Sequence, residues 1–442
     1  MKNQEPNNAS RRDFVINSGL IAGGLITSPI LSKANYFSGA EDTIKVAVVG
    51  CGGRGTGAAM QALSSKQNVK IVALCDAFKD NVDNCHKELT EEINNSIGEL
   101  AKRLDVPEER KFTGFDGYKK AIALADVVIL ATPPGFRPIH FEEAIAQGKH
   151  VFMEKPVATD PAGVQKVLAT AAIAKQKKLN VVVGLQRHYQ NSYRELFKRK
   201  SLIGDITSMQ AWWDNDGVWT RPRKAGQTEM EYQMRNWYYF NWLCGDHITE
   251  QHIHNLDVIN WFKGGYPVKA QGFGGRQVRT GKEHGEIFDH HYVEFEYADG
   301  SILNSQCRHM PGTMSRVDEL LIGTKGKIAF GAAHIKDHSG KIIYQFDTKK
   351  ENNPYQTEHD ELFAAIAKGE YKFADAENGA KSTMTSILGR MATYSGQMVY
   401  WDKAIHSGID IHPKVYAWDA TPPVVPDAEG RYPIAIPGIT KY

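Results

Sequence analysis

The sequence is short of cysteine and has little excess charge of either sign, and both features exclude classes of protein. Its 442 residues include five cysteines, and no two of them form a Cys-x-x-Cys pair. Neither a disulfide framework nor a zinc ribbon is therefore predicted. The 53 basic and 51 acidic side chains leave a formal net charge of +2, with no long run of one sign. Nucleic acid and anionic membrane surfaces are not expected partners, and a small neutral substrate fits this balance better.

Internal repeats and low-complexity segments are also lacking, so the chain is expected to form ordinary globular domains of roughly 150 residues each. The pattern changes near residue 185. Before it, strand-like and helical runs alternate, and after it strands and aromatic residues dominate. We expect four parts: an export signal and linker at 1–40, a nucleotide-binding domain at 41–185, a substrate-binding and oligomerisation domain at 186–412, and an extended tail at 413–442.

The chain has no apolar run of the length that spans a membrane, and its N-terminal run is of a particular kind. The run from Gly19 to Ile30 is shorter than the roughly 20 residues that a membrane helix needs. It follows Ser10-Arg11-Arg12-Asp13-Phe14 and precedes small residues at Ala34 and Ala40. This order resembles a twin-arginine export signal, and no cysteine near the expected cleavage region could carry a lipid. We expect a periplasmic protein without a stable membrane anchor.

What the sequence does have is a glycine fingerprint directly after a strand-like run. The motif Gly50-Cys51-Gly52-Gly53-Arg54-Gly55 follows Ile44–Val49 and opens the helical stretch Thr56–Ser64. In that context the glycines provide a tight turn, close approach to a pyrophosphate, and packing of the helix on the strand. The helix N-terminus then offers free N–H groups to the phosphates. An ordinary glycine-rich turn is the alternative. The residues expected to bind a dinucleotide here are Gly50, Gly52, Gly53, Arg54 and Gly55.

A carboxylate stands where a ribose contact is expected. The run Val69–Asp76 reads as the next parallel strand, and Asp76 lies about 20 residues beyond the fingerprint. It would accept hydrogen bonds from the adenosine 2′-hydroxyl and repel a 2′-phosphate, which favours NAD over NADP. Arg54 and Lys79 are close in sequence and would soften that repulsion. The alternative role for Asp76 is a helix cap.

The first domain is expected to contain a Rossmann-type, doubly wound parallel sheet, because strand-like and helical runs alternate from Ile44 to Gly184. The later strand-like runs are 126–130, 150–153 and 180–183. The later helical runs are 80–104, 139–147 and 161–177. The fold class that follows is α/β in this part of the chain.

The second domain is expected to be α+β, with a large, mostly antiparallel open sheet. A loop-rich aromatic region at 212–242 and a helix at 249–262 precede strand-like runs at 268–273, 292–297, 301–308 and 319–330. The turns at 298–300 and 325–326 indicate antiparallel pairing. A helical region at 358–400, broken at a glycine, and a proline-rich extended segment at 422–442 follow. Helices on one face would leave the other for self-association, so a dimer or tetramer is expected.

A charged pair closes one of the strand-like runs. Glu154, Lys155 and Pro156 follow 150–153, at the carboxyl end of a parallel strand, where open α/β sheets bind ligands. Pro156 restrains Lys155 to an extended backbone. Oxidation of an alcohol by NAD removes a hydride from carbon and a proton from oxygen, and a positioned lysine can hydrogen-bond that oxygen and share its proton. The alternative is a surface ion pair of little energetic value.

A second cluster of polar residues runs from Gly245 to Asp257. On one helix, Glu250, His254 and Asp257 would share a face, with either carboxylate orienting the histidine ring for proton transfer. A metal site is an alternative, because other histidines at 284, 290 and 291 could join. It ranks lower, since no second ligand set is suitably spaced, and no metal is expected. A solvated helix face is the remaining interpretation.

Together these motifs resemble the Gfo/Idh/MocA family, named for glucose-fructose oxidoreductase, inositol dehydrogenase and rhizopine catabolism. The resemblance covers nearly the whole chain after the export signal. Besides the fingerprint, its marks are Ala131-Thr132-Pro133-Pro134 with His140 downstream, Glu154-Lys155-Pro156, and Gly184-Leu185-Gln186-Arg187. The family's Asp-x-x-x-His pair falls on Glu250 and His254, where the carboxylate is longer by one methylene.

The resemblance implies roles for these residues. In the family the lysine and histidine act on the substrate hydroxyl, and the threonine-proline turn contacts the nicotinamide half of the cofactor. Lys155, His254 and Glu250 are therefore expected to be catalytic. The further residues expected to contact NAD are Thr132, Pro133, His140, Glu154, Lys155 and Arg187.

The expected function is NAD-dependent oxidation of a secondary hydroxyl of a sugar or glycoside. Free NAD is scarce outside the cytoplasm, so the cofactor is expected to be loaded before export and tightly held. Some relatives resemble hydrolases that use NAD to form a transient ketone, and a redox-neutral glycoside hydrolase is one alternative. A non-catalytic sugar-binding protein with a structural nucleotide is another. The residues expected to contact the carbohydrate are His188, Tyr189, Trp237 and Asp257.

Overall fold

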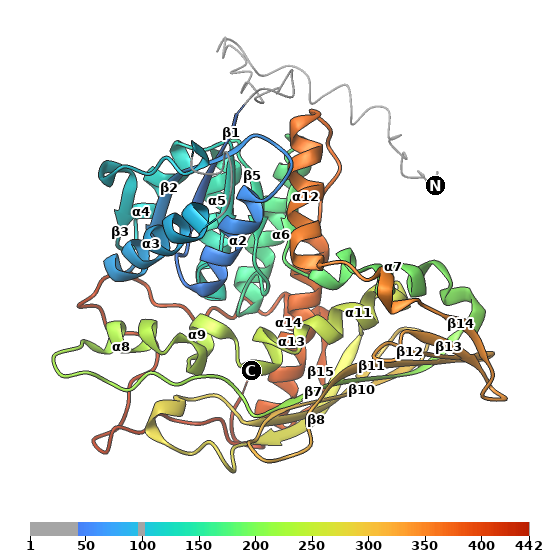
Figure 1. The fold of residues 1–442 in the computed structure, drawn as a ribbon. Helices are drawn as coiled ribbons and strands as arrows, with labels where there is room; N and C mark the ends of the chain where they lie inside the picture. The colour runs from blue at the N-terminus through green and yellow to red at the C-terminus, as the bar shows by residue number, and fades with distance from the viewer. Residues whose placement is uncertain (1–42, 96–101, 442) are drawn as a thin grey trace, which may run out of the picture. The chain divides into compact units, whose positions relative to one another are not determined.

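Both expected sheets are present in the computed structural model, which describes residues 43–95 and 102–441 (Figure 1). All the described residues belong to one structural unit. The expected export signal at 1–40 lies outside them. Among the helices that the structure describes, none has both the length and the apolar character needed to cross a membrane.

The first sheet has six parallel strands in the order β3-β2-β1-β4-β5-β6. The order reverses between β1 and β4, and this is the crevice where open α/β sheets bind their ligands. The doubly wound prediction is confirmed, and the short β3 is an addition to it. The strands are β1 Ile44–Val49, β2 Val69–Asp76, β3 Lys111–Thr113, β4 Val127–Leu130, β5 His150–Met153 and β6 Val181–Val183.

Helices cover both faces of this sheet, as its uninterrupted apolar strands require. In β1, Val46 and Val48 pack into one hydrophobic cluster with α2 and α3, while Ala47 and Val49 pack into another with α4, α5 and α6. The helix expected at 80–104 is shorter, because α3 ends at Asn95. The helices are α2 Gly53–Leu63, α3 Lys79–Asn95, α4 Gly117–Ala123, α5 Arg137–Ala146 and α6 Pro161–Gln176.

The second sheet has nine strands in the order β14-β13-β12-β11-β7-β10-β9-β8-β15, and only the β7–β10 pair is parallel. The mostly antiparallel prediction is confirmed. The strands are β7 Ile206–Asn215, β8 Lys269–Gly275, β9 His290–Glu296, β10 Ile302–His309, β11 Arg316–Gly323, β12 Gly326–Ala329, β13 His334–Asp337, β14 Ile342–Gln345 and β15 Val399–Tyr400.

Two expectations about this sheet were wrong. The region expected to begin as a loop at Trp212 is instead the end of the central strand β7, whose adjacent tryptophans hide the alternation of polar and apolar residues. The strand expected at 319–330 is two strands, β11 and β12, which pair antiparallel through a turn at Thr324-Lys325. The turn expected at 325–326 lies one residue earlier, because Gly326 already belongs to β12.

Helix α13 (Ala376–Ser395) packs between α6 of the first sheet and β8 of the second (Figure 1). Glycines permit this close packing: a Cβ on Gly379 would stand 3.0 Å from Val183, and one on Gly389 would stand 2.8 Å from Phe295. The helical region expected at 358–400 is thus α12 Pro354–Ala367 and α13, separated by a break, and it ends in the short strand β15. Helix α14 (Trp401–Ile405) follows directly. The shared helix α13 ties the two sheets together.

The segment after α14 forms no helix or strand over 406–441, yet it is packed. Trp418 contacts Phe115 and Phe78 at ring-centroid distances of 4.6 and 5.0 Å. Tyr432 meets Phe240 edge-on at 4.9 Å. The tail therefore covers the edge of the first sheet at the carboxyl ends of its strands.

Several histidines are buried and electrically neutral. Burial lowers the pKa of His140 and of His252 to about 3 and that of His150 to about 4. His150 accepts the backbone N–H of Asn180 on Nδ1 at 2.9 Å, which requires the unprotonated form of that nitrogen. In the unfolded chain each would titrate near 6.5.

We predict that the free energy of unfolding falls as the pH is lowered from about 7.5 to about 5. Below about pH 6.5 the unfolded chain binds protons that the folded chain excludes, so each such histidine contributes a loss of roughly 1.4 kcal/mol per pH unit. His188 and His412 act in the opposite sense, because Asp257 and Asp160 raise their pKa against the effect of burial. Urea denaturation at several pH values measures the slope of the free energy of unfolding against pH. His150→Gln should make that slope shallower by the contribution of one histidine. A flat profile would contradict the assignment.

Candidate active site

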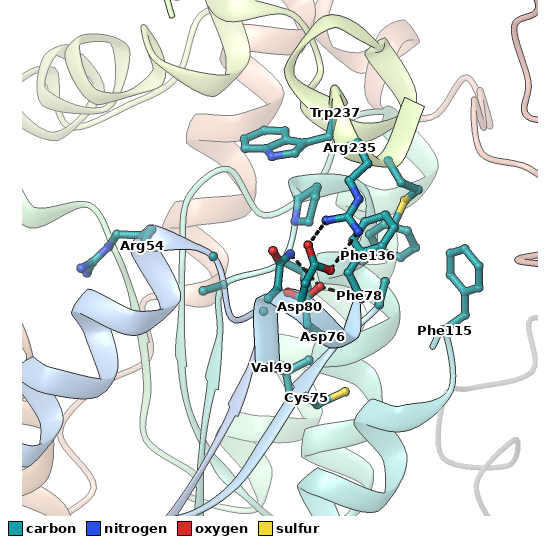
Figure 2. Close-up of a pocket in the computed structure, with 18 of the residues that line it drawn as sticks. Val49, Arg54, Cys75, Asp76, Phe78, Asp80, Phe115, Phe136, Arg235 and Trp237 are labelled. Atoms are coloured by element: carbon teal, nitrogen blue, oxygen red, sulfur yellow. Dashed lines mark hydrogen bonds and ion pairs between the residues drawn. The ribbon is translucent and has the colours of Figure 1, made fainter. Parts of the chain in front are cut away.

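A cavity of about 720 Å³ opens at the carboxyl ends of β1, β2 and β4 (Figure 2). It brings together most of the residues expected to bind a dinucleotide. A segment of the second domain, Trp219 to Trp237, forms part of its wall. The expected residues that line it are Gly50, Gly52, Gly53, Arg54, Asp76, Thr132, Pro133, His140 and Trp237.

The glycines of the fingerprint divide into two pairs with separate tasks. Gly50 has φ +100, and a Cβ there would stand 2.4 Å from the backbone of Thr132, while a Cβ on Gly55 would stand 1.8 Å from the Gly50 carbonyl. These two allow the turn and the packing. Gly52 and Gly53 have nothing within 4 Å of such a Cβ, and α2 has no side-chain cap at its N-terminus. The open backbone and free N–H groups fit a pyrophosphate.

Asp76 lies in the cavity at the end of β2 and is held by the chain around it. One carboxylate oxygen accepts Cys51 N–H at 2.8 Å, and the other accepts Phe78 N–H and Asn81 Nδ2 at 3.0 Å each. Burial raises its pKa, although these donors oppose the shift. Asp76 therefore caps the turn before α3 and keeps acceptor capacity for a ribose hydroxyl.

The cations expected to soften the charge of Asp76 point elsewhere. Arg54 makes an ion pair with Glu154 and lies 3.4 Å from Glu358, and Figure 2 shows it directed away from Asp76. Lys79 is exposed and pairs with Asp83 at 2.9 Å. That expectation was wrong, because both side chains find carboxylates on other elements. The carboxylate is left to exclude a 2′-phosphate.

Glu154 and Lys155 do not form the surface pair that was one interpretation of them. Lys155 Nζ donates to the Glu250 carbonyl at 2.6 Å and to its Oε1 at 3.1 Å, with side chains 11% and 10% exposed. Glu154 instead pairs with Arg54, and Gly184 makes room for it, since a Cβ there would stand 2.7 Å from its Oε2. Each charge is buried with a partner from another element.

The expected common face of Glu250, His254 and Asp257 does not exist. The helix expected at 249–262 is two helices, α10 (His247–Glu250) and α11 (Ile253–Lys263). The N–H groups of Gln251 and His252 both bond to the His247 carbonyl and break the helical register between them. Glu250 consequently turns toward Lys155. Asp257 binds His188, Ser382 and Asn378, so neither carboxylate orients His254.

His254 lies within the electrostatic influence of the Lys155 ammonium, and its buried ring is uncharged. Its ring stacks on Trp213 with centroids 5.8 Å apart, and its Nδ1 has no hydrogen-bond partner. Burial, with a further effect from Lys155, lowers its pKa well below the usual value. The same burial raises the pKa of Glu250, although Lys155 opposes it. The arrangement places a proton donor near a proton acceptor in a nearly dry site.

Several expected residues do not line the cavity: Gly55, Glu154, Lys155, Arg187, His188, Tyr189 and Asp257, together with Glu250 and His254. Three of them make contacts that had not been expected. Arg187 makes a buried ion pair with Glu319. His188 is bound to Asp257 at 2.7 Å and packs on Trp261, and Tyr189 donates to Asp375 at 2.9 Å. These contacts were invisible in the sequence because their partners come from distant elements. In the structure they attach the turn after β6 to the second domain.

Two features of the site were not predicted. The guanidinium of Arg137 is fully buried and donates to the Thr132 carbonyl at 2.6 Å and to the Glu154 carbonyl at 3.0 Å, which fixes both turns relative to each other. Across the cavity, Arg235 binds Asp80 through two contacts of 2.8 Å and lies 3.6 Å above the Phe78 ring (Figure 2). This Arg235–Asp80 contact, called the latch below, joins the second domain to the rim of the cavity at the end expected to hold the adenosine.

Comparison with known proteins agrees with this geometry. Residues 44–185 match the family model GFO_IDH_MocA, described as an oxidoreductase family with an NAD-binding Rossmann fold. An inositol 2-dehydrogenase of Gluconacetobacter diazotrophicus is 27% identical over 233 residues, which cover 52% of this chain and 57% of that protein. A glycosyl hydrolase family 109 protein of Solibacter usitatus is 31% identical over 165 residues, which cover 34% of this chain and 33% of that protein.

Solved structures show that the likeness in fold extends over both domains. The scyllo-inositol dehydrogenase of Lactobacillus casei with bound NAD(H) and scyllo-inositol has a TM-score of 0.60 at 20% identity, and covers 82% of this chain and 100% of that one. The aldose-aldose oxidoreductase of Caulobacter crescentus has a TM-score of 0.62 at 18% identity, covering 81% and 100%. In sequence, the chain spans about three fifths of the length of the curated relatives that it matches.

We predict that Arg235→Ala speeds the release of NADH by about threefold to tenfold, because a bidentate ion pair and a cation–π contact that close the cavity are lost together. Cofactor fluorescence after dilution measures the release rate. Arg110→Ala is the matched control, since it removes another surface ion pair of 2.8 Å, with Asp105, outside the cavity. Equal rates in the two variants would show that the latch does not retain the dinucleotide.

Proposed function

We propose that this chain, whose residues 44–185 match the Gfo/Idh/MocA family model, uses NAD to oxidise a secondary hydroxyl of a sugar or glycoside. One observation carries the proposal. The ammonium of Lys155 is fixed by two contacts to Glu250, within the electrostatic reach of a neutral His254, at the carboxyl end of β5. An alcohol needs this pair of groups to lose a proton as it is oxidised.

Bound NAD supplies the hydride acceptor. Side chains of the protein supply the groups that bind the substrate hydroxyl and accept its proton. Lys155 hydrogen-bonds the substrate hydroxyl oxygen and stabilises the negative charge that develops on it, and His254 accepts the proton because its buried ring is uncharged. Glu250 holds the ammonium in place through its carbonyl and its carboxylate, so its longer side chain serves as an anchor for Lys155.

The substrate class rests on the lining of the cavity and on the relatives. Trp219 and Trp237 meet edge-on with centroids 5.9 Å apart in the cavity wall, and such rings suit the apolar faces of a sugar. Named relatives act on inositol or on aldoses. These features support a polyhydroxylated ring as the substrate.

The cofactor is proposed to stay bound through turnover. The second domain and the tail close over the cavity, through Arg235 and through Trp418 on Phe78. This suits a protein exported after folding, which is the proposal for the segment 1–40 with its Arg11-Arg12 pair. A retained cofactor must be reset within each cycle, either by a second substrate or by return of the hydride.

Return of the hydride defines the second candidate, a redox-neutral glycoside hydrolase. The likeness to the glycosyl hydrolase family 109 protein favours it. Both candidates share the first oxidation and therefore need Lys155 and His254. The third candidate, a sugar-binding protein with a structural nucleotide, does not account for a fixed ammonium beside a neutral base.

One experiment separates the three candidates. The purified protein is incubated with a panel of glycosides, and cofactor absorbance and sugar products are followed together. Accumulation of a keto-sugar with bound NADH identifies a dehydrogenase. Free sugar without net reduction of NAD identifies a hydrolase. Absence of both, with measurable sugar binding, would refute the enzyme proposal.

We predict that Lys155→Met lowers turnover by at least a hundredfold and leaves nucleotide binding nearly unchanged, because the variant removes the hydrogen bond to the reacting oxygen but no contact in the cavity. Steady-state rates and NAD titration measure the two effects. The matched control is Lys149→Met, at the opposite end of β5, which should keep full activity. A fully active Lys155→Met protein would refute the assignment.

The proposed homo-oligomer uses the outer face of the second sheet. Phe273 is 64% exposed there and stacks on Tyr292, its cross-strand partner, at 5.1 Å. We predict that Phe273→Lys weakens self-association at least tenfold, because burial of a phenylalanine contributes about 1.5–3 kcal/mol in each copy. Light scattering after gel filtration measures the mass. Ile173→Lys, on exposed α6, is the control, and an unchanged mass for Phe273→Lys would place the contact elsewhere.

A further inference from the structure

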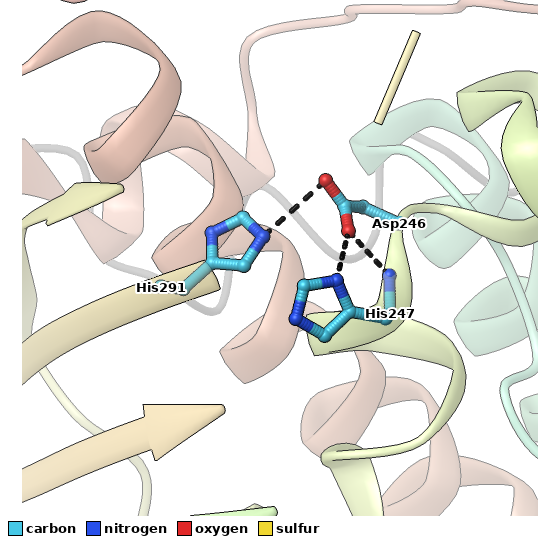
Figure 3. A group of neighbouring side chains, drawn as sticks. All are labelled: Asp246, His247 and His291. Atoms are coloured by element: carbon cyan, nitrogen blue, oxygen red, sulfur yellow. Dashed lines mark hydrogen bonds and ion pairs between the residues drawn. The ribbon is translucent and has the colours of Figure 1, made fainter. Parts of the chain in front are cut away.

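Beyond the proposed site, three donor groups converge in the interior of the second domain. Asp246 and His247 are fully buried at the start of α10, and His291 of β9 is 3% exposed (Figure 3). One nitrogen of each histidine and one oxygen of the carboxylate all lie within 4.8 Å of one another. A cluster of this kind in a dry interior requires an account of its charges and protons.

The carboxylate of Asp246 is held in its ionised form. It accepts the backbone N–H of Phe288 at 3.0 Å and that of His247 at 2.5 Å, and the Tyr394 hydroxyl donates to it as well. Donors on both oxygens favour the anion. The buried negative charge therefore needs a positive partner.

The hydrogen-bond network assigns the proton of His291. The Thr393 hydroxyl donates to the Arg390 carbonyl at 3.1 Å, so at 2.9 Å it must accept from Nδ1–H of His291. In the neutral ring, Nε2 then carries a lone pair. That nitrogen lies 3.3 Å from a carboxylate oxygen of Asp246. Two lone pairs would face each other at this distance unless a cation lies between them.

His247 presents a second nitrogen that the protein does not satisfy. Its Nδ1 lies 2.8 Å from the other carboxylate oxygen, but the direction is wrong for a hydrogen bond, and neither ring nitrogen has a hydrogen-bond partner. The side chain is fully buried. An unpaired imidazole nitrogen beside a carboxylate is the usual environment of a metal ligand.

We propose that Asp246, His247 and His291 bind a divalent transition-metal cation, through the carboxylate of Asp246, Nδ1 of His247 and Nε2 of His291. Adjacent ligands around an ion with bonds of about 2.0–2.2 Å are separated by about 3.0–3.4 Å. Each nitrogen lies close to this spacing from a different carboxylate oxygen, Nδ1 at 2.8 Å from one and Nε2 at 3.3 Å from the other. Two imidazoles and a carboxylate suit Zn²⁺ among the common cations. Thr393 acts as the outer partner that orients the His291 ring.

A second cluster, of two carboxylates and one histidine, shows the contrasting case. His412 Nδ1 lies 3.0 Å from Asp160 and 3.1 Å from Asp410, and the two carboxylates raise its pKa although burial opposes this. There the histidine proton supplies the positive charge, and no cation is needed. The other histidines considered from the sequence, His284 and His290, pair with Glu283 and Asp289, so neither belongs to the proposed metal site.

Other cations do not take the place of the metal. The guanidinium of Arg390 is buried nearby, and its hydrogen bond goes to the Thr159 carbonyl at 2.7 Å. Nε2 of His291 makes no hydrogen bond to the carboxylate in spite of the 3.3 Å separation, so its direction does not suit a shared proton. The Asp246 backbone is also unusual, with φ +71 and ψ 161, a conformation that favours glycine. The residue at this position is an aspartate nonetheless.

The metal would fix the turn from which α10 starts and join it to β9. Glu250 is four residues beyond Asp246, at the other end of the same short helix, and it holds Lys155. The cation is thus a positioning element for the reactive lysine. It lies apart from the dinucleotide cavity, whose lining includes none of its three ligands.

The first test is elemental analysis of the full-length protein, purified without a metal-binding tag from zinc-supplemented cells and dialysed. We expect about one equivalent of Zn²⁺ per chain in the wild type and less than about a tenth in His291→Ala. His290→Ala, the adjacent residue on the same strand, is the control and should retain the metal. A wild-type protein without metal, or full retention in His291→Ala, would overturn the proposal.

A second test does not depend on a variant that folds. An anomalous difference map at the zinc edge, from crystals of the wild-type protein, should show a peak between Asp246, His247 and His291. A peak only at other residues, or none in crystals grown with Zn²⁺, overturns the proposal whatever the variants show.

Discussion

The contact between Lys155 and Glu250 is the interaction on which the site depends. It joins the end of a strand in the first sheet to the end of a helix in the second domain, with both side chains about nine-tenths buried. A buried ammonium is stable only where its donors are met, and here a carbonyl and a carboxylate meet two of them. The group proposed to act on the substrate is therefore held in place only when both domains are in register. The shared helix α13 and the buried Arg137 maintain that register from either side.

The surroundings of this contact are arranged to exclude water. A stacked tryptophan and buried histidine and arginine side chains occupy this region, and burial lowers the pKa of His254 and of Arg137. Low dielectric strengthens the attraction between the ammonium and a developing oxyanion. The same dryness makes every unpaired polar atom expensive, so polar atoms without a protein partner point to missing ligands. His247 carries that signal in the interior of the second domain, because neither of its ring nitrogens has a hydrogen-bond partner.

Closure of the dinucleotide cavity comes from outside the nucleotide-binding domain. Residues of the segment between β7 and α9 (Asn241–Cys244), together with the tail, complete a wall that the first sheet leaves open. The carboxylate of Asp76 lies at the expected ribose position, and within the described residues it makes no ion pair. The proposed retention of the dinucleotide and the proposed exclusion of a 2′-phosphate thus rest on different parts of the chain.

The sequence by itself determined the elements whose signals are local. Periodicity and glycine chemistry located the parallel strands, the phosphate-binding turn with Gly50 and Gly55, the carboxylate of Asp76 and the lysine at the end of β5. Only the tertiary structure decided what these groups contact. Arg54 leaves Asp76 for Glu154, the helix through Glu250 and His254 breaks so that each faces a different partner, and Arg187, His188 and Tyr189 bind carboxylates far along the chain. Side-chain partners across the sheets depend on how the elements pack, and packing is a property of the folded chain that short-range patterns do not contain.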